Sequence, residues 1–271
     1  MRGGLGPRPA KRKVASGRRR IAGERGHVSA GMKIAMARSP KRTARTSASI
    51  ADLAANRAAA LAANPVSRET LARLDRFVAA LLDWQRRVNL IAPSTIPHLW
   101  TRHVADSLQL VALAPQARVW ADLGSGGGFP GLVIACALAG MPGAKVYLIE
   151  SIGKKAAFLH EAARLAEVPA IVHQARIEHF VANVPERIDA VTARALAPLP
   201  ELLALSAPLL KTGAQALFPK GQDVEAELTE ASKYWNIEAM LVPSRTEPRA
   251  RIVLVSRAER RAPGRQGTSV P

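Results

Sequence analysis

The chain has 271 residues, of which 48% are hydrophobic, and it carries 39 Lys and Arg against 21 Asp and Glu. This apolar content is too high for a wholly disordered chain and suffices for one large domain or two small ones. A single cysteine, Cys136, excludes an intramolecular disulfide framework. The most apolar stretch, residues 129–144, is interrupted by prolines and glycines before it reaches the roughly 18–20 residues of a membrane span.

The positive charge is concentrated at the start of the chain. Residues 1–48 hold 14 basic residues and one acid, Glu24, without any hydrophobic period, so we predict a disordered basic arm. Three interpretations of this arm stay open: a segment that grips RNA phosphates, an extension upstream of the true start at Met32 or Met36, or a cleaved targeting peptide. Residues 258–271 are predicted to form a second basic, disordered tail.

Residues 49–114 are predicted to form a helical extension. Residues 49–63 are rich in alanine and favour a helix, and Ser67 can cap a second helix whose apolar residues recur every three or four positions. That stripe runs through Leu71, Leu74, Val78, Leu81, Gln85 and Val88. A loop is expected over residues 89–97, followed by a helix over residues 98–113.

After Pro115 the pattern changes to short apolar strands that alternate with helices. The strands are predicted at residues 118–123, 145–150, 170–173, 188–192 and 214–218, and the helices at 130–140, 153–166, 177–183, 197–210 and 222–235. This alternation is typical of parallel βαβ units in one sheet. The last two strands, 237–242 and 251–256, are too close together for a helix between them, so we predict an antiparallel hairpin.

A glycine-rich loop follows the first predicted strand, in the sequence VWADLGSGGGFPGL at residues 119–132. Gly124, Gly126 and Gly128 let the backbone turn sharply and approach a ligand closely. The next strand ends in Glu150, an acid placed to accept hydrogen bonds from both hydroxyls of a ribose. These features predict a cofactor that contains adenosine, bound on a Rossmann-like sheet.

Two cofactors share this adenosine, a nicotinamide dinucleotide and S-adenosylmethionine. Gly126, Gly128 and Gly131 even match the G-x-G-x-x-G of dinucleotide-binding proteins. However, the sheets of those proteins normally continue in parallel, whereas the C-terminal hairpin and the Asp-x-Gly-x-Gly at residues 122–126 resemble class I methyltransferases. We therefore predict a seven-stranded, mostly parallel class I methyltransferase domain over residues 115–257, with S-adenosylmethionine as its cofactor.

Further sequence blocks extend this resemblance. In chain order they are VNLIA at 88–92, RHVADSL at 102–108, DLGSGGGFPGL at 122–132, IESIGKKAAFL at 149–159, ARIEHF at 175–180, VTARAL at 191–196 and FPKGQ at 218–222. Together they resemble the RsmG (GidB) family of bacterial 16S ribosomal RNA guanine-N7 methyltransferases, over roughly residues 67–258. The resemblance implies transfer of a methyl group to one guanine of 16S ribosomal RNA, with the small ribosomal subunit as partner.

The resemblance also implies which residues contact the cofactor. Gly124 and Phe129 would lie against it at the glycine loop, and Glu150 would take the ribose. Ile177 and Glu178 would flank the adenine, and Arg194 would face its methionine end or the target base. Glu150 stands where the family commonly has Asp, which keeps the carboxylate and lengthens its reach.

The substrate side is less strongly indicated by the resemblance. Arg102 and His103 would shape the target pocket, or else dock the helical extension through a buried polar network, and Lys220 would approach an RNA phosphate or remain solvated. Guanine N7 carries a lone pair and no proton, so its methylation needs no general base, and no catalytic residue is assigned. No metal site, no membrane segment, a monomer and a cytoplasmic location are expected.

Three alternatives remain open on the sequence alone. The first is a methyltransferase that acts on another RNA site or on a small molecule. The second is a nicotinamide-dependent oxidoreductase, which would bind a dinucleotide and not S-adenosylmethionine. The third is a non-enzymatic RNA-binding module that depends on the basic arm.

Overall fold

The computed structural model describes residues 50–261. The basic arm predicted for residues 1–48 lies outside the described residues, and so does the part of the predicted tail after residue 261. No helix in the described part of the chain is long and apolar enough to cross a membrane. All nine residues predicted to form the site lie within the described range.

Seven strands form one sheet in the order β3-β2-β1-β4-β5-β7-β6. They are β1 (Val119–Leu123), β2 (Lys145–Ile149), β3 (Ala170–His173), β4 (Ala190–Thr192), β5 (Gln215–Lys220), β6 (Trp235–Pro243) and β7 (Arg251–Arg260). β1 to β5 pair in parallel, whereas β7 is antiparallel to both β5 and β6. This confirms the predicted Rossmann-like α/β methyltransferase sheet with its C-terminal antiparallel hairpin. Its strand order reverses between β1 and β4, where such sheets bind their ligands.

Helices precede the sheet and connect its strands. The N-terminal ones are α1 (Ile50–Ala63), α2 (Arg68–Trp84), η1 (Pro93–His98), η2 (Trp100–Ala105) and α3 (Asp106–Leu113). Those between strands are α4 (Gly131–Leu138), α5 (Gly153–Ala166), α6 (Ile177–Ala182), α7 (Leu199–Lys211) and α8 (Val224–Ser232). Ser67 caps α2 as predicted, because its side chain accepts a hydrogen bond from the N–H of Thr70 at 3.1 Å.

The structure differs from the predicted elements in three places. Residues 93–97, expected in a loop, belong to the 3₁₀ helix η1 (Pro93–His98), whose first residue is a proline with a suitable fixed φ. The helix expected over residues 98–113 begins as the π-helix η2, whose wider turn a 3.6-residue period does not reveal. β7 continues to Arg260, which pairs with Trp235, so the sheet extends beyond residue 257, the predicted end of the domain.

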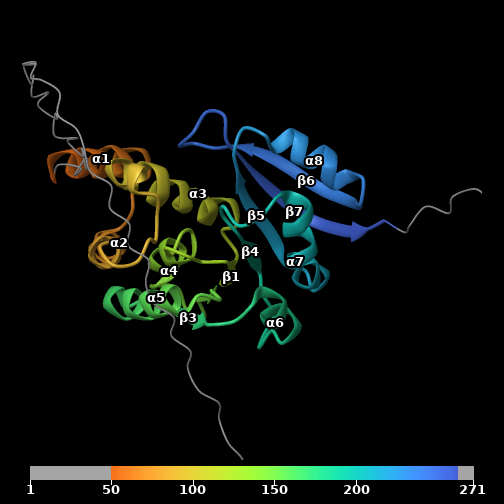
Figure 1. Cartoon of the computed structure of the whole chain (residues 1–271), viewed down its shortest axis with the longest axis horizontal. Helices are drawn as coiled ribbons and strands as arrows, with labels where there is room; N and C mark the ends of the chain where they lie inside the picture. Colours follow the sequence, from red (N-terminus) through yellow and green to blue (C-terminus); the bar gives the residue numbers. More distant parts are fainter. Residues whose placement is uncertain (1–49, 262–271) are drawn as a thin grey trace, which may run out of the picture. The chain divides into compact units, whose positions relative to one another are not determined.

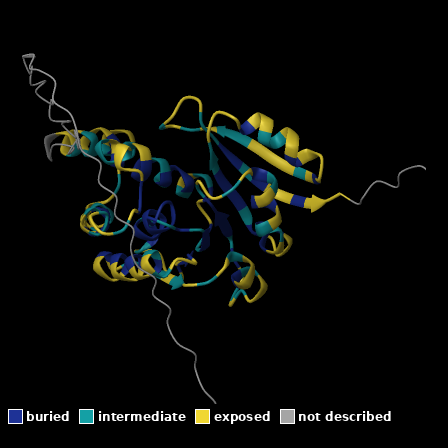
Figure 2. Cartoon of the chain, viewed as in Figure 1, coloured by how far each residue is buried: buried dark blue, intermediate teal, exposed yellow. Residues whose placement is uncertain are grey.

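Two layers of helices cover the two faces of the sheet (Figure 1). Successive side chains of a strand point to opposite faces, so Val146 and Leu148 of β2 pack in the core with α2, α4 and α5. Tyr147 and Ile149 pack in the second core with α6, α7 and α8. Figure 2 shows the central strands and α4 buried between helices whose outer faces are exposed, whereas β6 at the edge of the sheet is largely exposed.

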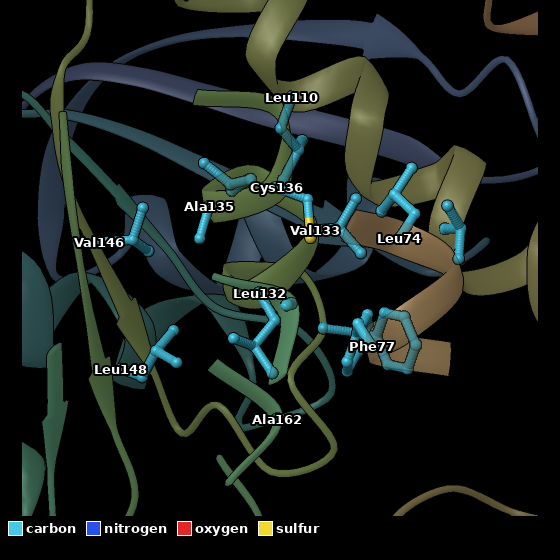
Figure 3. Close-up of a cluster of buried hydrophobic side chains, with 14 of the residues drawn as sticks. Leu74, Phe77, Leu110, Leu132, Val133, Ala135, Cys136, Val146, Leu148 and Ala162 are labelled. Atoms are coloured by element: carbon cyan, nitrogen blue, oxygen red, sulfur yellow. The ribbon is translucent and has the colours of Figure 1, made fainter. Parts of the chain in front are cut away.

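Helix α4 is buried on all sides. Its sequence, GLVIACAL, contains no polar side chain, because the sheet covers one side of it and α2, α3 and α5 cover the others (Figure 3). Burial raises the pKa of the Cys136 thiol to about 12, so this side chain packs as a small apolar group. The helical extension therefore contributes a large part of the core that supports the glycine loop, which directly precedes α4.

Candidate active site

The glycine loop lies between β1 and α4, at the carboxyl end of the central strand. Gly124, Gly126 and Gly128 have φ angles of +73°, +52° and +85°, a region that other residues rarely adopt. The N–H of Gly124 donates to the carbonyl of Ile149 at 2.9 Å, which fixes the start of the loop against β2. The loop thus has the sharp turn that the sequence predicted.

Glu150 follows β2 and is buried against this loop. Its Oε2 accepts a hydrogen bond from the N–H of Gly126 at 3.0 Å, and its Oε1 accepts one from the N–H of Ile152 at 2.8 Å. Each carboxylate oxygen can accept a second bond, so two acceptors stay available for a pair of hydroxyls. The side chain is therefore fixed beside the loop, as a ribose-binding acid requires.

Asp122, the last acid before the loop, is fully buried under the start of α4. Its Oδ2 accepts a hydrogen bond from the N–H of Gly131 at 3.0 Å, and its Oδ1 has no partner within the described residues. Burial raises the pKa of Asp122 to about 7. A Cβ on Gly131 would lie 2.3 Å from Leu148, so this glycine lets α4 pack closely on the sheet.

Phe129 ends the glycine loop and packs against the helical extension. Its ring lies 5.1 Å from that of Phe77 in α2 and stacks on His103 of η2 at 4.9 Å. The ring of His103 is also hydrogen-bonded through Nε2 to the hydroxyl of Thr95 at 2.9 Å. Burial and the charges of two nearby arginines lower the pKa of His103 to about 3, so the imidazole is neutral at physiological pH.

Gln85 holds a second segment against the glycine loop. Its Oε1 accepts hydrogen bonds from the N–H groups of Leu90 and Ile91 at 2.9 and 3.0 Å, and its Nε2 donates to the carbonyl of Ile91 at 2.9 Å. The backbone of Leu90 in turn lies so close to Gly127 that a Cβ there would be 2.9 Å from its carbonyl oxygen. The sequence placed Gln85 on an apolar stripe and gave no sign of this role.

The segment after β4 covers the other side of the loop. Ala195 has a φ of +53°, and the side chain of Leu196 lies 2.8 Å from where a Cβ on Gly124 would be. Arg194 precedes them, with its side chain 18% exposed. Its guanidinium donates to the carbonyl of Arg102 at 3.0 Å and lies 3.6 Å from the carboxylate of Asp106. One guanidinium nitrogen is buried without a partner in the described structure, so it can bind an acidic ligand group.

A cleft of about 570 Å³ opens beside Arg194, within the size range of small-molecule sites. It lies at the carboxyl ends of β4 and β5, between η2 and the β6–β7 connection. Its lining residues are His98, Thr101, Arg102, Asp106, Arg194, Ala195, Pro219, Lys220, Gly221, Glu227, Ser244, Thr246, Glu247, Ala250, Arg251 and Ile252. The structure therefore brings together three of the predicted residues, Arg102, Arg194 and Lys220.

Two of the predicted substrate-side residues have surroundings that the sequence did not foresee. Lys220 is only 10% exposed, and its ammonium group binds the carboxylate of Glu227 at 2.6 Å and the carbonyl of Ala197 at 3.0 Å. It is neither a solvated lysine nor an unpaired cation. His103 does not line the cleft and lies behind Phe129, in the buried polar arrangement that the sequence left as the alternative.

The remaining predicted residues lie at the start of α6. Ile177 is half-buried in the second core, and Glu178 is exposed in the first turn of the helix. Among residues 50–261, no three His, Cys, Asp or Glu side chains lie close enough together to hold a metal ion. The arrangement is that of a site for an organic cofactor next to an open, charged cleft.

Known proteins are similar to this chain over most of its length. A Ribosomal RNA small subunit methyltransferase G from Bradyrhizobium sp. (strain BTAi1) is 60% identical over 217 residues, which cover 79% of this chain and 98% of that protein. The protein of the same name from Bradyrhizobium diazoefficiens is 62% identical over 209 residues, covering 77% and 80% of the two chains. Among solved structures, a putative O-methyltransferase from Klebsiella pneumoniae aligns with 12% identity and a TM-score of 0.47, covering 74% of this chain and 96% of that one.

A model of one protein family matches most of the sheet-forming body and part of the helical extension. It is described as GidB, rRNA small subunit methyltransferase G, and it matches residues 70–252. The matched range contains the glycine loop, Glu150, Arg194 and the cleft. The chain therefore belongs to the GidB family of rRNA small subunit methyltransferases.

Proposed function

We propose that this protein transfers the methyl group of S-adenosylmethionine to N7 of one guanine in 16S ribosomal RNA. The observation that carries the proposal is the position of the cleft, which opens beside Arg194 at the carboxyl ends of the strands next to the glycine loop. A base in the cleft and a cofactor on the loop would meet at Arg194. The family to which the chain belongs supports the same reaction.

The residues around the loop fit the cofactor. Gly124 permits close approach, Glu150 offers two acceptors to the ribose, and Ile177 with Glu178 at the start of α6 flank the adenine. The unpartnered guanidinium nitrogen of Arg194 fits the carboxylate of the methionine end. Phe129 closes the loop, with His103 stacked behind it.

The reaction depends mainly on how the methyl donor and the guanine are positioned. S-adenosylmethionine supplies a methyl group already activated by its sulfonium, and guanine N7 supplies a lone pair without a proton. The protein therefore needs to hold the two groups in line and to exclude water. Correct positioning of this kind can remove a large part of the activation free energy. The purine gains positive charge during transfer, and the carboxylate of Glu247, which lines the cleft, lowers the cost of that charge.

The substrate side is assigned as follows. Arg102 lines the cleft with an exposed side chain that can reach the RNA. Lys220 acts as a fixed charge at the cleft floor, because Glu227 and Ala197 hold its ammonium group in place. His103 acts indirectly, by supporting Phe129. A target in a loop or splayed out of its helix fits such a cleft, because N7 is poorly accessible in paired A-form RNA.

We further propose that the protein acts as a monomer in the cytoplasm, on the small ribosomal subunit or its RNA. Every group named above comes from one chain, which supports the monomer. The location follows from the substrate, since ribosomal RNA of bacteria is modified where ribosomes assemble.

The experiment combines the purified full-length protein, methyl-labelled S-adenosylmethionine and small subunits from cells that lack this modification. Label in the RNA is located by borohydride–aniline cleavage, which is specific for N7-methylguanine. A single cleavage site in 16S ribosomal RNA is the expected result. Label without cleavage would refute the N7 assignment, and binding of S-adenosylmethionine without label in the RNA would indicate a different substrate.

A further inference from the structure

The connection between β6 and β7, residues 244–250, forms one wall of the cleft. Ser244, Thr246, Glu247 and Ala250 line it. The connection closes on itself, because the N–H of Ser244 donates to the carbonyl of Ala250 at 3.1 Å and the N–H of Ala250 donates to that of Glu247 at 3.0 Å. It is a compact loop with a defined shape.

A buried side chain from α3 fixes this loop. Gln109 is 3% exposed, and its Oε1 accepts a hydrogen bond from the N–H of Arg245 at 3.0 Å. Its Nε2 donates to the hydroxyl of Ser244 at 3.3 Å and to the carboxylate of Asp106 at 2.9 Å. Buried polar networks of this kind hold their members in one arrangement.

The same network reaches the cofactor side of the cleft. The hydroxyl of Thr246 donates to Oδ1 of Asp106 at 2.7 Å, while Oδ2 of Asp106 lies 3.6 Å from Arg194. The loop and the arginine beside the glycine loop are therefore bound to the same carboxylate. The contacts of Thr246 and of Arg194 with Asp106 therefore fix the position of the loop relative to the cofactor side of the cleft.

The loop carries two free cations that do not line the cleft themselves but are adjacent in sequence to residues that do. Arg245 and Arg249 are exposed, and neither guanidinium forms a hydrogen bond or an ion pair within residues 50–261. Two other exposed cations, Arg87 and Lys233, instead pair with a carboxylate three or four positions earlier in the chain. Free guanidinium groups on a loop that walls the cleft are suited to bidentate contact with phosphates.

We propose that residues 244–250 are the surface that binds the RNA backbone beside the target guanine. Arg245 and Arg249 bind the phosphates that flank the flipped nucleotide, and Gln109 is the positioning residue that holds them at the cleft. Phosphate contacts of this kind set the register of a protein on RNA, and the cleft then receives the base. This assignment rests on the proposed function, because it takes RNA as the substrate.

The test compares two full-length double variants, both of which lose two cations. Arg245→Ala/Arg249→Ala removes the loop arginines. Arg187→Ala/Lys211→Ala removes two exposed cations that precede β4 and β5, at the amino ends of the strands and so opposite the cleft. Binding to unmodified 16S ribosomal RNA is measured over a series of salt concentrations. The loop variant should bind about tenfold more weakly, with a salt slope smaller by about 1 to 2 than that of the wild type.

The affinity for S-adenosylmethionine, measured on the same proteins, should not change. An equal loss in both variants, or an unchanged salt slope in the loop variant, would overturn the proposal. Normal binding to naked RNA with weaker binding to assembled subunits would also overturn it and indicate a ribosomal protein as the contact. RNA binding that depends on the loop, in a wild-type protein that methylates no guanine N7, would instead contradict the proposed reaction and leave the loop assignment standing.

Discussion

The two walls of the candidate site are built by different physical means. Around the glycine loop, positive φ angles and apolar packing by Phe77, Phe129 and α4 determine the shape, with few charged side chains involved. At the β6–β7 loop, a network of side-chain hydrogen bonds from Gln109 and Asp106 does so. The first wall cannot tolerate added or removed atoms, whereas the second depends on polar partners. Changes to each wall should therefore have different consequences.

The largest effect is expected from removing an aromatic ring behind the glycine loop. Phe77 is fully buried and contacts the rings of Phe129 and Phe158. Phe77→Ala should lower the free energy of unfolding by about 3–5 kcal/mol, as measured by denaturant titration. Met240→Ala, at a side chain that is 59% exposed, is the control and should change it by less than about 0.5 kcal/mol. Equal effects of the two variants would show that the helical extension does not support the loop.

The next effect concerns the glycine loop itself. Gly124→Ala places a methyl group at a φ of +73°, which strains the backbone of the loop, and 2.8 Å from the side chain of Leu196, which must shift. The affinity for S-adenosylmethionine, measured by calorimetry, should fall at least about tenfold, which corresponds to about 1.4 kcal/mol. Gly140→Ala has no heavy atom within 4 Å of the new methyl group and should bind as the wild type does. Undiminished binding by Gly124→Ala would argue against the loop as the cofactor site.

A smaller and more selective effect is expected on the polar wall. Gln109→Leu fills a similar volume but leaves the N–H of Arg245 and the hydroxyl of Ser244 without their partner. The variant should lose about tenfold in kcat/KM for RNA while its affinity for S-adenosylmethionine stays within about twofold of the wild type. Thr229→Ala, at an exposed hydroxyl of α8, serves as the control. Loss of cofactor affinity in Gln109→Leu would contradict the separation of the two walls.

A further test uses the pH dependence of stability that Asp122 confers. Its pKa is about 7 in the folded protein and near the ordinary 3.8 when unfolded. Between these values the folded state keeps a proton that the unfolded state has lost, so raising the pH from about 4 to about 7 lowers the free energy of unfolding. Above this range both states are ionised and the trend ends.

This dependence is isolated by comparing the wild type with Asp122→Asn. The difference in free energy of unfolding between the two proteins should move in favour of the variant as the pH rises through that window. Asp223→Asn, at an exposed carboxylate, should leave the pH profile as it is in the wild type. A difference between wild type and Asp122→Asn that stays constant with pH would show that Asp122 is ionised in the folded state throughout.

The sequence predicted the sheet better than it predicted the site. The parallel strands, the C-terminal hairpin and the glycine loop are local patterns, and the structure confirms them. The role of Gln109 could not be predicted, because its partners lie 135 and 136 positions away and no periodicity indicates such a contact. The pairing of Lys220 with Glu227 was missed because the sequence of a strand end does not show which carboxylate a following helix brings near.

The contacts of the helical extension were also not predictable from local sequence patterns. Its helices were predicted from alanine content and apolar spacing. The contact of Phe77 with Phe129 depends on tertiary packing, and the hydrogen bonds of Gln85 to residues 90 and 91 depend on the path of the chain after α2. The signal for such a contact is recognisable only once the structure is known: a glutamine on an otherwise apolar stripe is a half-buried polar group that requires partners. A polar residue at a predicted core position is therefore worth testing as a support for a nearby loop.

The division of the site into a cofactor wall and an RNA wall is tested most directly by two affinities of the Arg245→Ala/Arg249→Ala protein. One is its affinity for S-adenosylmethionine, determined by calorimetry, and the other is its affinity for 16S ribosomal RNA. If the two walls bind different partners, the affinity for S-adenosylmethionine should equal that of the wild type while the affinity for RNA falls about tenfold. A parallel loss of both affinities would contradict the division of the site into a cofactor wall and an RNA wall.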